Sequence, residues 1–509
     1  MQQRVLVSSF VAFAMSGALV LACGDDDDSS TNGTPDGGTQ TPDAGGSTQE
    51  DSGPTTDAAP DGDTEVPALA PIVPVTTTRI GNAINPYGLV YASDGFLYAS
   101  GATIEGGVRK LAAWRFKDGA LDTTFGTEGV VTTDIPGDES SFDIVEVSNG
   151  SFVVHAVGGG KIHLVKLTNS GGTFSFGTPV FVKFGYDDGE GWPAGTPNAP
   201  AAAPSYQSWG IAVDRSNSAA PKIVVFASGA PTKAANSAEQ RTDSDRWITR
   251  VMADTLAFDT TFNGGAPFSV DADGKKLADN ARRGIVLADG SIVSAGYTSF
   301  GQNAQHVVLI RLLASGAVDP AFGFGTSAPT PGQTKINPFS GDNGTAEAYG
   351  IARQSSGRYI TTGYGTSNFD VPTKSVDLVS LGVMSDGLDP SFGRQGAAAW
   401  QSENDKAAGL GAAPYTDRGR DVVVLADERI VQVGSYDDYA SVFVFDKNGK
   451  PDLSSGTNGL IDYAYPAGFF KVAVSPDGKQ LATTAQSLNQ TTDAGAPLGS
   501  VLAILKVGQ

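Results

Sequence analysis

The feature that most constrains the fold is an internal repeat that returns seven times after residue 84. Each copy has an apolar run, a tight turn such as Asp94-Gly95, and a second apolar run. Asp-Gly and Asn-Gly pairs supply the positive φ that two-residue hairpin turns need. Short runs of alternating or continuous apolar residues favour strands over helices. The seven hairpins begin at Tyr87, Phe142, Trp209, Arg283, Tyr349, Arg420 and Phe470.

A third apolar run follows every hairpin, and in six copies a further turn and a recurring phrase follow that run. The phrase is clearest as Leu121-Asp122-Thr123-Thr124-Phe125-Gly126. An Asp at this place can bond the backbone two residues on and start a turn. We expect the Phe to pack between neighbouring sheets, while a role for the Asp or Phe in a binding site is the alternative. Units with four strands each predict an all-β protein.

The two ends of the repeat region predict how the array closes. The seventh unit reaches Gln509 after its third run, and residues 73–80 look like the fourth run of the first unit, 130–135. We therefore expect 73–80 to complete the last unit beside 500–505, which leaves no exposed edge at either end. The predicted fold is a seven-bladed β-propeller of four-stranded antiparallel blades, with the N-terminal strand closing the last blade.

These motifs resemble the delta-60 repeat family of secreted bacterial proteins. The closest matches are 87–131, 283–323 and 349–396, and the likeness weakens in the second and sixth units. In the sixth unit, Asp452-Leu453-Ser454-Ser455-Gly456 lacks the Phe. The resemblance implies a β-propeller-like array and no enzymatic activity, because the repeating residues of the family are structural.

The first 23 residues have the pattern of an export signal with a lipid attachment site. Arg4 precedes the apolar run 5–21, and a small residue, Ala22, stands before Cys23, as in a secretory signal. A Cys at this place resembles the lipobox of bacterial lipoproteins, which implies cleavage before Cys23 and acylation of that residue. An uncleaved membrane helix is the alternative, because the run is about the minimum length for a span. We expect a lipid-anchored protein of the bacterial cell envelope, and Gly24 after the Cys favours the outer membrane over the inner one.

The next segment, 24–65, contains twelve Asp or Glu residues and no Lys, Arg or aromatic residue. Such a composition predicts a disordered tether. The predicted organisation is a signal peptide at 1–22, the lipidated Cys23 and an acidic tether at 23–65, and a propeller at 66–509. The whole chain has 34 basic and 55 acidic residues, which argues against nucleic acid as a partner. We expect a monomer that meets the membrane through its N-terminal lipid.

Insertions predict which end of the ring is functional, because loops on rigid scaffolds usually carry function. They fall mainly between second and third strands or between consecutive units, at 185–208, 229–245, 298–305, 364–375, 400–419 and 485–498. Trp192, Tyr206 and Trp209 surround the longest insertion, where they could stack on a ligand or hold the loop in place. We therefore expect a binding or scaffold protein whose ligand is a protein or a polysaccharide.

Catalytic motifs are absent from the sequence, and we expect no cofactor, metal or catalytic residue. The three His residues, His155, His163 and His306, lie on predicted strands of different kinds or blades. Segments 187–190 and 271–274 have only part of a calcium-loop pattern. The alternative function is a hydrolase or lyase with a carboxylate or metal site in the central channel. The innermost strands are expected to offer mostly Gly, Val, Ala and Ile, which weakens that alternative.

Overall fold

The computed structural model describes most of the chain after residue 68. The described residues are 69–135, 140–182, 184, 207–229, 243–272, 277–299, 305–323, 331–339, 345–366, 376–400, 417–463, 465–486 and 499–508. They belong to the second of two compact units, Leu69–Gln509. The predictions for the export signal, Cys23 and the acidic tether therefore lie outside the described residues. No helix within the described ranges is long and apolar enough to cross a membrane.

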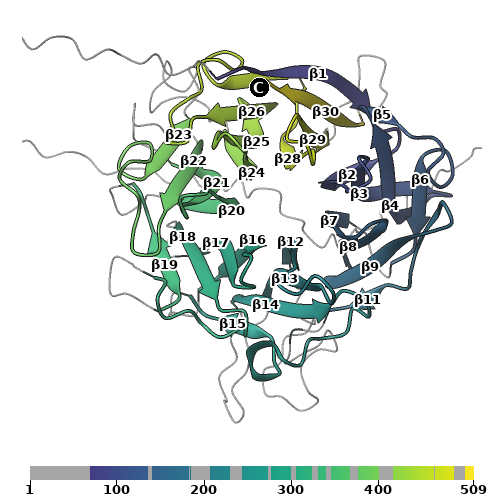
Figure 1. The fold of residues 1–509 in the computed structure, drawn as a ribbon, viewed down its shortest axis with the longest axis horizontal. Coiled ribbons are helices and arrows are strands. Elements are labelled where there is room, and N and C mark those ends of the chain that lie inside the picture. The colour runs from purple at the N-terminus through teal and green to yellow at the C-terminus, as the bar shows by residue number, and fades with distance from the viewer. Residues whose placement is uncertain are drawn as a thin grey trace, which may run out of the picture. The chain divides into compact units, whose positions relative to one another are not determined.

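Seven antiparallel sheets surround a common axis (Figure 1), as the repeat predicts. From the axis outward, blade 1 has β2 (Ile84–Tyr91), β3 (Leu97–Glu105), β4 (Val108–Lys117), β5 (Ala120–Leu121) and β6 (Val130–Thr133). Blade 2 has β7 (Ser140–Ser148), β8 (Ser151–Gly158), β9 (Lys161–Ser170), β10 (Thr173–Phe176) and β11 (Val180–Phe181). In these two blades, a pair of short strands shares the outermost position.

The next blades have four strands each. Blade 3 has β12 (Gln207–Asp214), β13 (Lys222–Gly229), β14 (Asp245–Met252) and β15 (Phe268–Val270). Blade 4 has β16 (Asp279–Val286), β17 (Ile292–Ser299), β18 (Gln305–Leu312) and β19 (Gln333–Ile336). Blade 5 has β20 (Ala346–Arg353), β21 (Tyr359–Gly365), β22 (Asp377–Val383) and β23 (Ala397–Trp400). Blade 6 has β24 (Arg418–Val424), β25 (Ile430–Tyr436), β26 (Tyr439–Phe445) and β27 (Leu460–Asp462).

The last blade joins the start of the described chain to its end. Blade 7 has β28 (Phe469–Val474), β29 (Gln480–Gln486), β30 (Ser500–Val507) and, outermost, β1 (Ile72–Arg79). β1 runs antiparallel to β30, with Ile72 opposite Val507 and Arg79 opposite Val501. The predicted closure of the ring by the N-terminal strand is confirmed.

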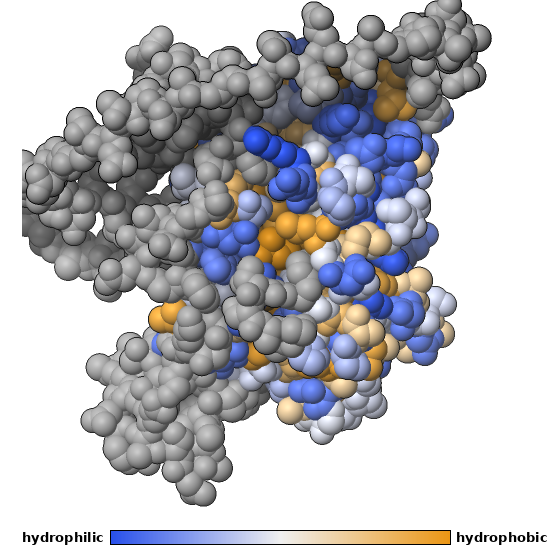
Figure 2. All heavy atoms as spheres, turned by 90° about the vertical axis from the view of Figure 1, so that its left-hand side faces the viewer, coloured by the Kyte–Doolittle hydropathy of each residue, from blue (hydrophilic) through white to orange (hydrophobic). Residues whose placement is uncertain are grey.

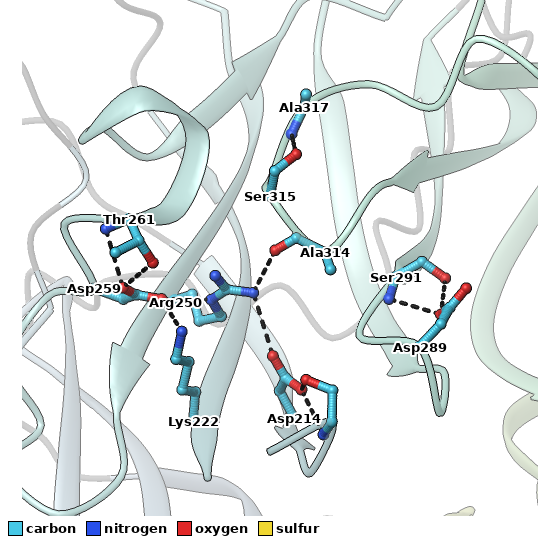
Figure 3. Close-up of polar contacts among 11 residues, drawn as sticks. Asp214, Lys222, Arg250, Asp259, Thr261, Asp289, Ser291, Ala314, Ser315 and Ala317 are labelled. Carbon is cyan, nitrogen blue, oxygen red and sulfur yellow. Dashed lines mark hydrogen bonds and ion pairs between the residues drawn. The ribbon is translucent and has the colours of Figure 1, made fainter. Parts of the chain in front are cut away.

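The recurring Asp builds the same turn at the outer part of five blades. In blade 3, Asp259 accepts hydrogen bonds from the backbone N–H (3.0 Å) and the hydroxyl (2.6 Å) of Thr261, as Figure 3 shows. Its other oxygen accepts from Arg250 at 2.8 Å and pairs with Lys222 at 2.8 Å. Burial alone would raise the pKa of Asp259, but Lys222, Thr261 and Arg250 lower it well below its ordinary value. The predicted turn is confirmed, whereas the buried Arg partner was not predicted.

The Phe of the phrase fills the space between consecutive blades, as predicted. Phe125, Phe262, Phe322 and Phe392 are each at most 1% exposed. Phe392 of blade 5, for example, packs in one cluster with Ile430 and Phe443 of blade 6. Burying a Phe side chain contributes about 1.5–3 kcal/mol, so these rings are major links between neighbouring sheets.

The sixth unit departs from this rule where the ring closes. Ser455 occupies the place of the Phe, is fully buried, and accepts a hydrogen bond from the backbone N–H of Ile72 at 2.9 Å. Nearby, the fully buried Arg429 donates to the carbonyl oxygens of Ala70 (2.7 Å) and Gly508 (3.3 Å). The missing Phe is thus replaced by polar groups that bind the first and last residues of the propeller.

The outer surface of the ring is mixed in character. Figure 2 looks at the side of the ring formed by blades 4 and 5 and shows hydrophilic side chains interspersed with small hydrophobic areas. Such scattered apolar groups are normal on soluble proteins.

Candidate functional site

A β-bulge interrupts the innermost strand of every blade close to its first residue. The register shift falls between Ser208 and Gly210 in β12, for example, so that Trp209 has no partner on β13. Bulges re-aim side chains, and here they supply the residues that meet near the axis. The bulged positions include Tyr87, Phe142, Trp209, Arg282, Arg283, Tyr349, Arg420 and Phe470.

Five of these residues form an axial aromatic layer, defined as Tyr87, Phe142, Trp209, Tyr349 and Phe470. Tyr87 stacks on Phe470 with ring centroids 3.9 Å apart, and Phe142 lies 5.2 Å from Trp209. Trp209 is 5.5 Å from Tyr349 and 6.4 Å from Phe470. Blades 3 and 7 are not neighbours, so the contact between Trp209 and Phe470 crosses the axis. Aromatic side chains therefore pack together where the seven sheets converge.

Four charged residues form an axial ionic layer next to these rings: Asp143, Arg283, Asp421 and Lys471. Asp143 lies 3.2 Å from Lys471 and 3.8 Å from Arg283. Asp421 lies 3.8 Å from each of the same two cations. Arg283 of blade 4 also donates to the carbonyl oxygen of Phe470 in blade 7, at 3.2 Å. The layer holds two positive and two negative charges, so it is electrically balanced.

The expectation that the innermost strands offer mostly Gly, Val, Ala and Ile is therefore wrong at the axis. Small and apolar residues do make up much of these strands, but the bulges bring the exceptions together. One signal could have revealed them: the first residue of each of the seven repeat copies is aromatic or Arg.

A third group, the Arg282 cluster, consists of Arg282, Tyr297, Glu347, Tyr349 and Tyr364. Arg282 donates to the hydroxyls of Tyr297 (2.6 Å) and Tyr349 (3.2 Å). The hydroxyls of Tyr349 and Tyr364 lie 3.0 Å apart. The guanidinium also lies over the ring of Tyr349, at 4.6 Å. All but Tyr364 are at most 7% exposed.

Burial determines the protonation of this cluster. It raises the pKa of Tyr297 and of Tyr364 well above the ordinary value, so both phenols stay protonated and do not act as bases. Burial also raises the pKa of Glu347, although Arg282 and the hydroxyls of Tyr364 and Tyr349 lower it in part. Burial alone would lower the pKa of Arg282, but the phenols and Glu347 raise it above its ordinary value. Arg282 is therefore always charged.

Of the three aromatic residues predicted to face a ligand, the structure describes Trp209. Trp209 belongs to the axial aromatic layer, where Arg282 lies 5.0 Å from its ring. Trp192 and Tyr206 lie outside the described residues, as do most of the predicted insertions and the calcium-loop segments 187–190 and 273–274. Packing at the axis is thus the role that the structure gives Trp209.

The three His residues lie inside blades rather than at a common centre. His155 on β8 is fully buried, neither ring nitrogen has a hydrogen-bond partner, and burial lowers its pKa to about 3. His163 lies on β9 and His306 on β18. Among the residues that the structure describes, no group of three or more His, Cys, Asp or Glu side chains could hold a metal ion.

Comparison with known proteins assigns no family to the chain. No protein-family model and no curated protein matches the chain. The polysaccharide lyase Uly1 is 11% identical with a TM-score of 0.42, covering 84% of this chain and 91% of its own. Luciferin-regenerating enzyme is 9% identical with a TM-score of 0.36 (85% and 97%), and Sqt1 from Chaetomium thermophilum is 11% identical with a TM-score of 0.39 (85% and 100%). These neighbours differ in function, and it is the chain's own sheet topology that makes it a seven-bladed β-propeller.

Proposed function

We propose that this protein is a lipid-anchored binding or scaffold protein of the bacterial cell envelope, related to the delta-60 repeat family. It holds a protein or a polysaccharide at one end of the ring. Cys23 carries the lipid, and the outer membrane is the favoured location. The repeat, the export signal and the acidic segment after it support this proposal together.

The direction of the strands supports the choice of end. In antiparallel blades, innermost strands begin and second strands finish at the same end of the ring, here called the upper end. The predicted insertions join strands at that end. The Arg282 cluster lies there too, because Arg282 and Glu347 are early in β16 and β20 while Tyr297 and Tyr364 are late in β17 and β21.

One observation favours binding over catalysis: aromatic rings and opposite charges from different blades contact one another at the axis. Rings from blades 1, 2, 3, 5 and 7 pack together, and the axial ionic layer is balanced. Residues arranged in this way make a rigid platform, which favours ligand binding because little ordering is needed.

A hydrolase or lyase is the second candidate, and the acidic side chains near the axis favour it. Asp143, Glu347 and Asp421 come from three different blades, and paired carboxylates can serve as general acid and base. Purified protein assayed against a panel of polysaccharides, with metal analysis of the same sample, tests this candidate. Cleavage that is lost in Glu347→Gln and retained in the exposed-site variant Arg353→Gln would support it over binding alone.

The anchor is tested by labelling cells with an alkyne fatty acid. We expect label on the wild-type protein and none on Cys23→Ala, which lacks the thiol that carries the lipid. Absence of label on the wild-type protein would instead favour the uncleaved signal helix.

The binding function is tested with the purified, detergent-solubilised lipoprotein on a glycan array and against purified envelope proteins. We expect saturable binding of the folded protein to at least one polysaccharide or protein. Heat-denatured protein serves as the control and should not bind that ligand. The absence of saturable binding to every probe would contradict the proposal.

A further inference from the structure

Exposed apolar side chains gather at the seam where the last blade meets blade 6. The seam patch is defined as Leu69, Val73, Val75 and Leu453, whose exposed fractions are 40, 41, 60 and 75%. These four are nearly half of the nine large apolar residues that are exposed in the described part of the chain. Single exposed apolar residues are normal, whereas a group of them marks an interaction surface.

The two parts of the seam patch are far apart in the sequence, and Arg429 brings them together. Its Nη1 atom donates to the carbonyl oxygen of Ala70 at 2.7 Å and lies 3.4 Å from the carboxylate of Asp452. Each of these partners is the chain neighbour of a patch residue, Leu69 or Leu453. The other two patch residues lie near the start of β1. Closure of the ring therefore creates the patch.

The seam patch lies at the lower end of the ring, opposite the upper end. Ile72, the first residue of β1, faces Val507, the last residue of β30. β30 is the third strand of its blade, and third strands run from the upper end to the lower one. Leu453 lies between the third and fourth strands of blade 6, which are also joined at the lower end. The patch and the predicted insertions are thus at opposite ends.

The segment that precedes the propeller joins it at this same patch. The described chain begins at Leu69, and residues 24–68 separate it from Cys23. A flexible coil of this length spans about 35–40 Å. A lipid on Cys23 would therefore keep the seam patch close to the bilayer. Linkage of this kind raises the effective concentration of one partner near the other, so a small apolar contact is sufficient for docking.

The charges beside the seam patch also suit a bilayer surface. Lys450, in the same turn region of blade 6, and Lys506, on β30 beside β1, are both exposed. Lysine side chains can lay their apolar stems along a membrane surface while the ammonium group reaches the headgroups. The nearby carboxylates of Asp427 and Asp452 pair with Arg429, at 2.7 and 3.4 Å. Positive charges therefore remain free at the edge of the patch.

We propose that the seam patch docks on the lipid bilayer, with its apolar side chains among the headgroups and the upper end of the ring turned away from the membrane. This inference rests on the lipid anchor of the proposed function and adds an orientation to it. Interfacial binding of this kind scales with the apolar area that enters the bilayer. The orientation leaves the predicted insertions at the upper end accessible to a ligand outside the membrane.

The test uses a fluorescent label on the full-length lipoprotein, in vesicles of phosphatidylethanolamine and phosphatidylglycerol that contain nitroxide-bearing lipids. Cys23 is the only Cys of the chain, so once it is acylated an introduced Cys is the single reactive thiol. Leu453→Cys places the label in the patch. Val108→Cys is the matched control, because Val108 is 56% exposed and lies at the upper end, where β3 and β4 are joined. We expect at least threefold stronger quenching at position 453. Equal quenching, or stronger quenching at position 108, would overturn the proposal.

A charge placed in the patch supplies a second test. Val75→Glu in the labelled Leu453→Cys protein should weaken quenching at least threefold, because a carboxylate is expensive to bring into the bilayer. Ile104→Glu is the matched control, since Ile104 is 55% exposed at the upper end, and it should leave the quenching unchanged. Both positions are exposed, so neither change empties a core site. Equal effects of the two substitutions would contradict docking through the seam patch.

Flotation of the vesicles separates failure of the anchor from failure of the docking. Wild-type protein that does not float with the vesicles contradicts the anchor and the inference together. Protein that floats while its label at position 453 stays in water contradicts the inference alone.

Iodide, a quencher confined to water, tests a second copy of the chain as the occupant of the patch. We expect the label at position 453 to stay shielded from iodide when the protein is diluted in the membrane. Shielding that disappears on dilution, with weak nitroxide quenching throughout, would identify a second copy as the partner and overturn docking on lipid.

Discussion

The outer part of the ring and its axis are built on opposite rules. At the outer part, one solution is reused: Asp bonds the backbone two residues on in five blades, and a buried Phe fills four junctions between blades. At the axis, the equivalent bulged position holds Tyr, Phe, Trp or Arg, and each makes different contacts. The repeated residues thus account for the assembly of the ring, whereas the residues at the axis differ from blade to blade.

The largest expected effect tests whether the outer Phe residues really are the main links. Phe392→Ala should lower the free energy of unfolding by about 3–5 kcal/mol, because it empties a fully buried site. The half-buried Phe470→Ala at the axis should cost less than half as much. Urea denaturation of both variants measures the difference, and a larger loss for Phe470→Ala would reverse the comparison.

Acid should lower the free energy of unfolding through the buried His155 on β8, the second strand of blade 2. The pKa of His155 is about 3 in the folded protein and about 6.5 in an unfolded chain. Below pH 6.5 the unfolded chain takes up a proton that the folded protein excludes, so stability falls as the pH falls, by roughly 3 kcal/mol at pH 4. His155→Leu should remove this part of the pH dependence.

Urea denaturation between pH 7 and pH 4 checks the effect of His155. His163→Gln, on the adjacent strand, serves as the matched control and should keep most of the slope. Identical pH profiles for the wild type and His155→Leu would rule out the buried imidazole as the cause.

The exception in the sixth unit offers a way to break the outer rule. Ser455→Phe restores the phrase, yet it removes the acceptor for the backbone N–H of Ile72 and places a ring against the closing strand. We expect a loss of about 1–3 kcal/mol, as for other overpacked sites, measured by urea denaturation. A gain in stability would mean that the junction tolerates the general rule after all.

The smallest expected effect concerns the balance of the axial ionic layer. Lys471→Met should cost about 1 kcal/mol, in the range of a single hydrogen bond. Arg283 and the backbone N–H groups of Ile144 and Ile211 still serve Asp143 in this variant. A double-mutant cycle with Asp143→Asn isolates the pair, and a coupling energy near zero would show that Lys471 does not stabilise Asp143.

The sequence predicts the repeated part of the molecule because repetition is visible in one chain. The seven hairpins, the Asp turn, the buried Phe and the pairing of β1 with β30 all follow from patterns that recur. The Arg282 cluster could not be predicted in the same way. The cluster depends on a bulge in β16 that contains two residues, whereas the bulge in blade 3 contains one. It also depends on tyrosines near the ends of β17 and β21.

Long-range partners also explain why charges at the axis escaped prediction. Lys471 and Asp143 are far apart in sequence, and only closure of the ring brings them to 3.2 Å. The overall composition of each innermost strand does not reveal such residues, because most of the strand is small or apolar. The first residue of each repeat copy, which is aromatic or Arg in all seven, indicates the axial residues better.

The pairing of β1 with β30 has a consequence for biosynthesis. A ribosome makes β1 first and β30 last, and at about 5–20 residues per second roughly 20–90 s separate them. During that time the outermost strand of blade 7 has no partner, however many other blades have already formed. Completion of the ring is therefore a late event that waits for the whole repeat array to be synthesised.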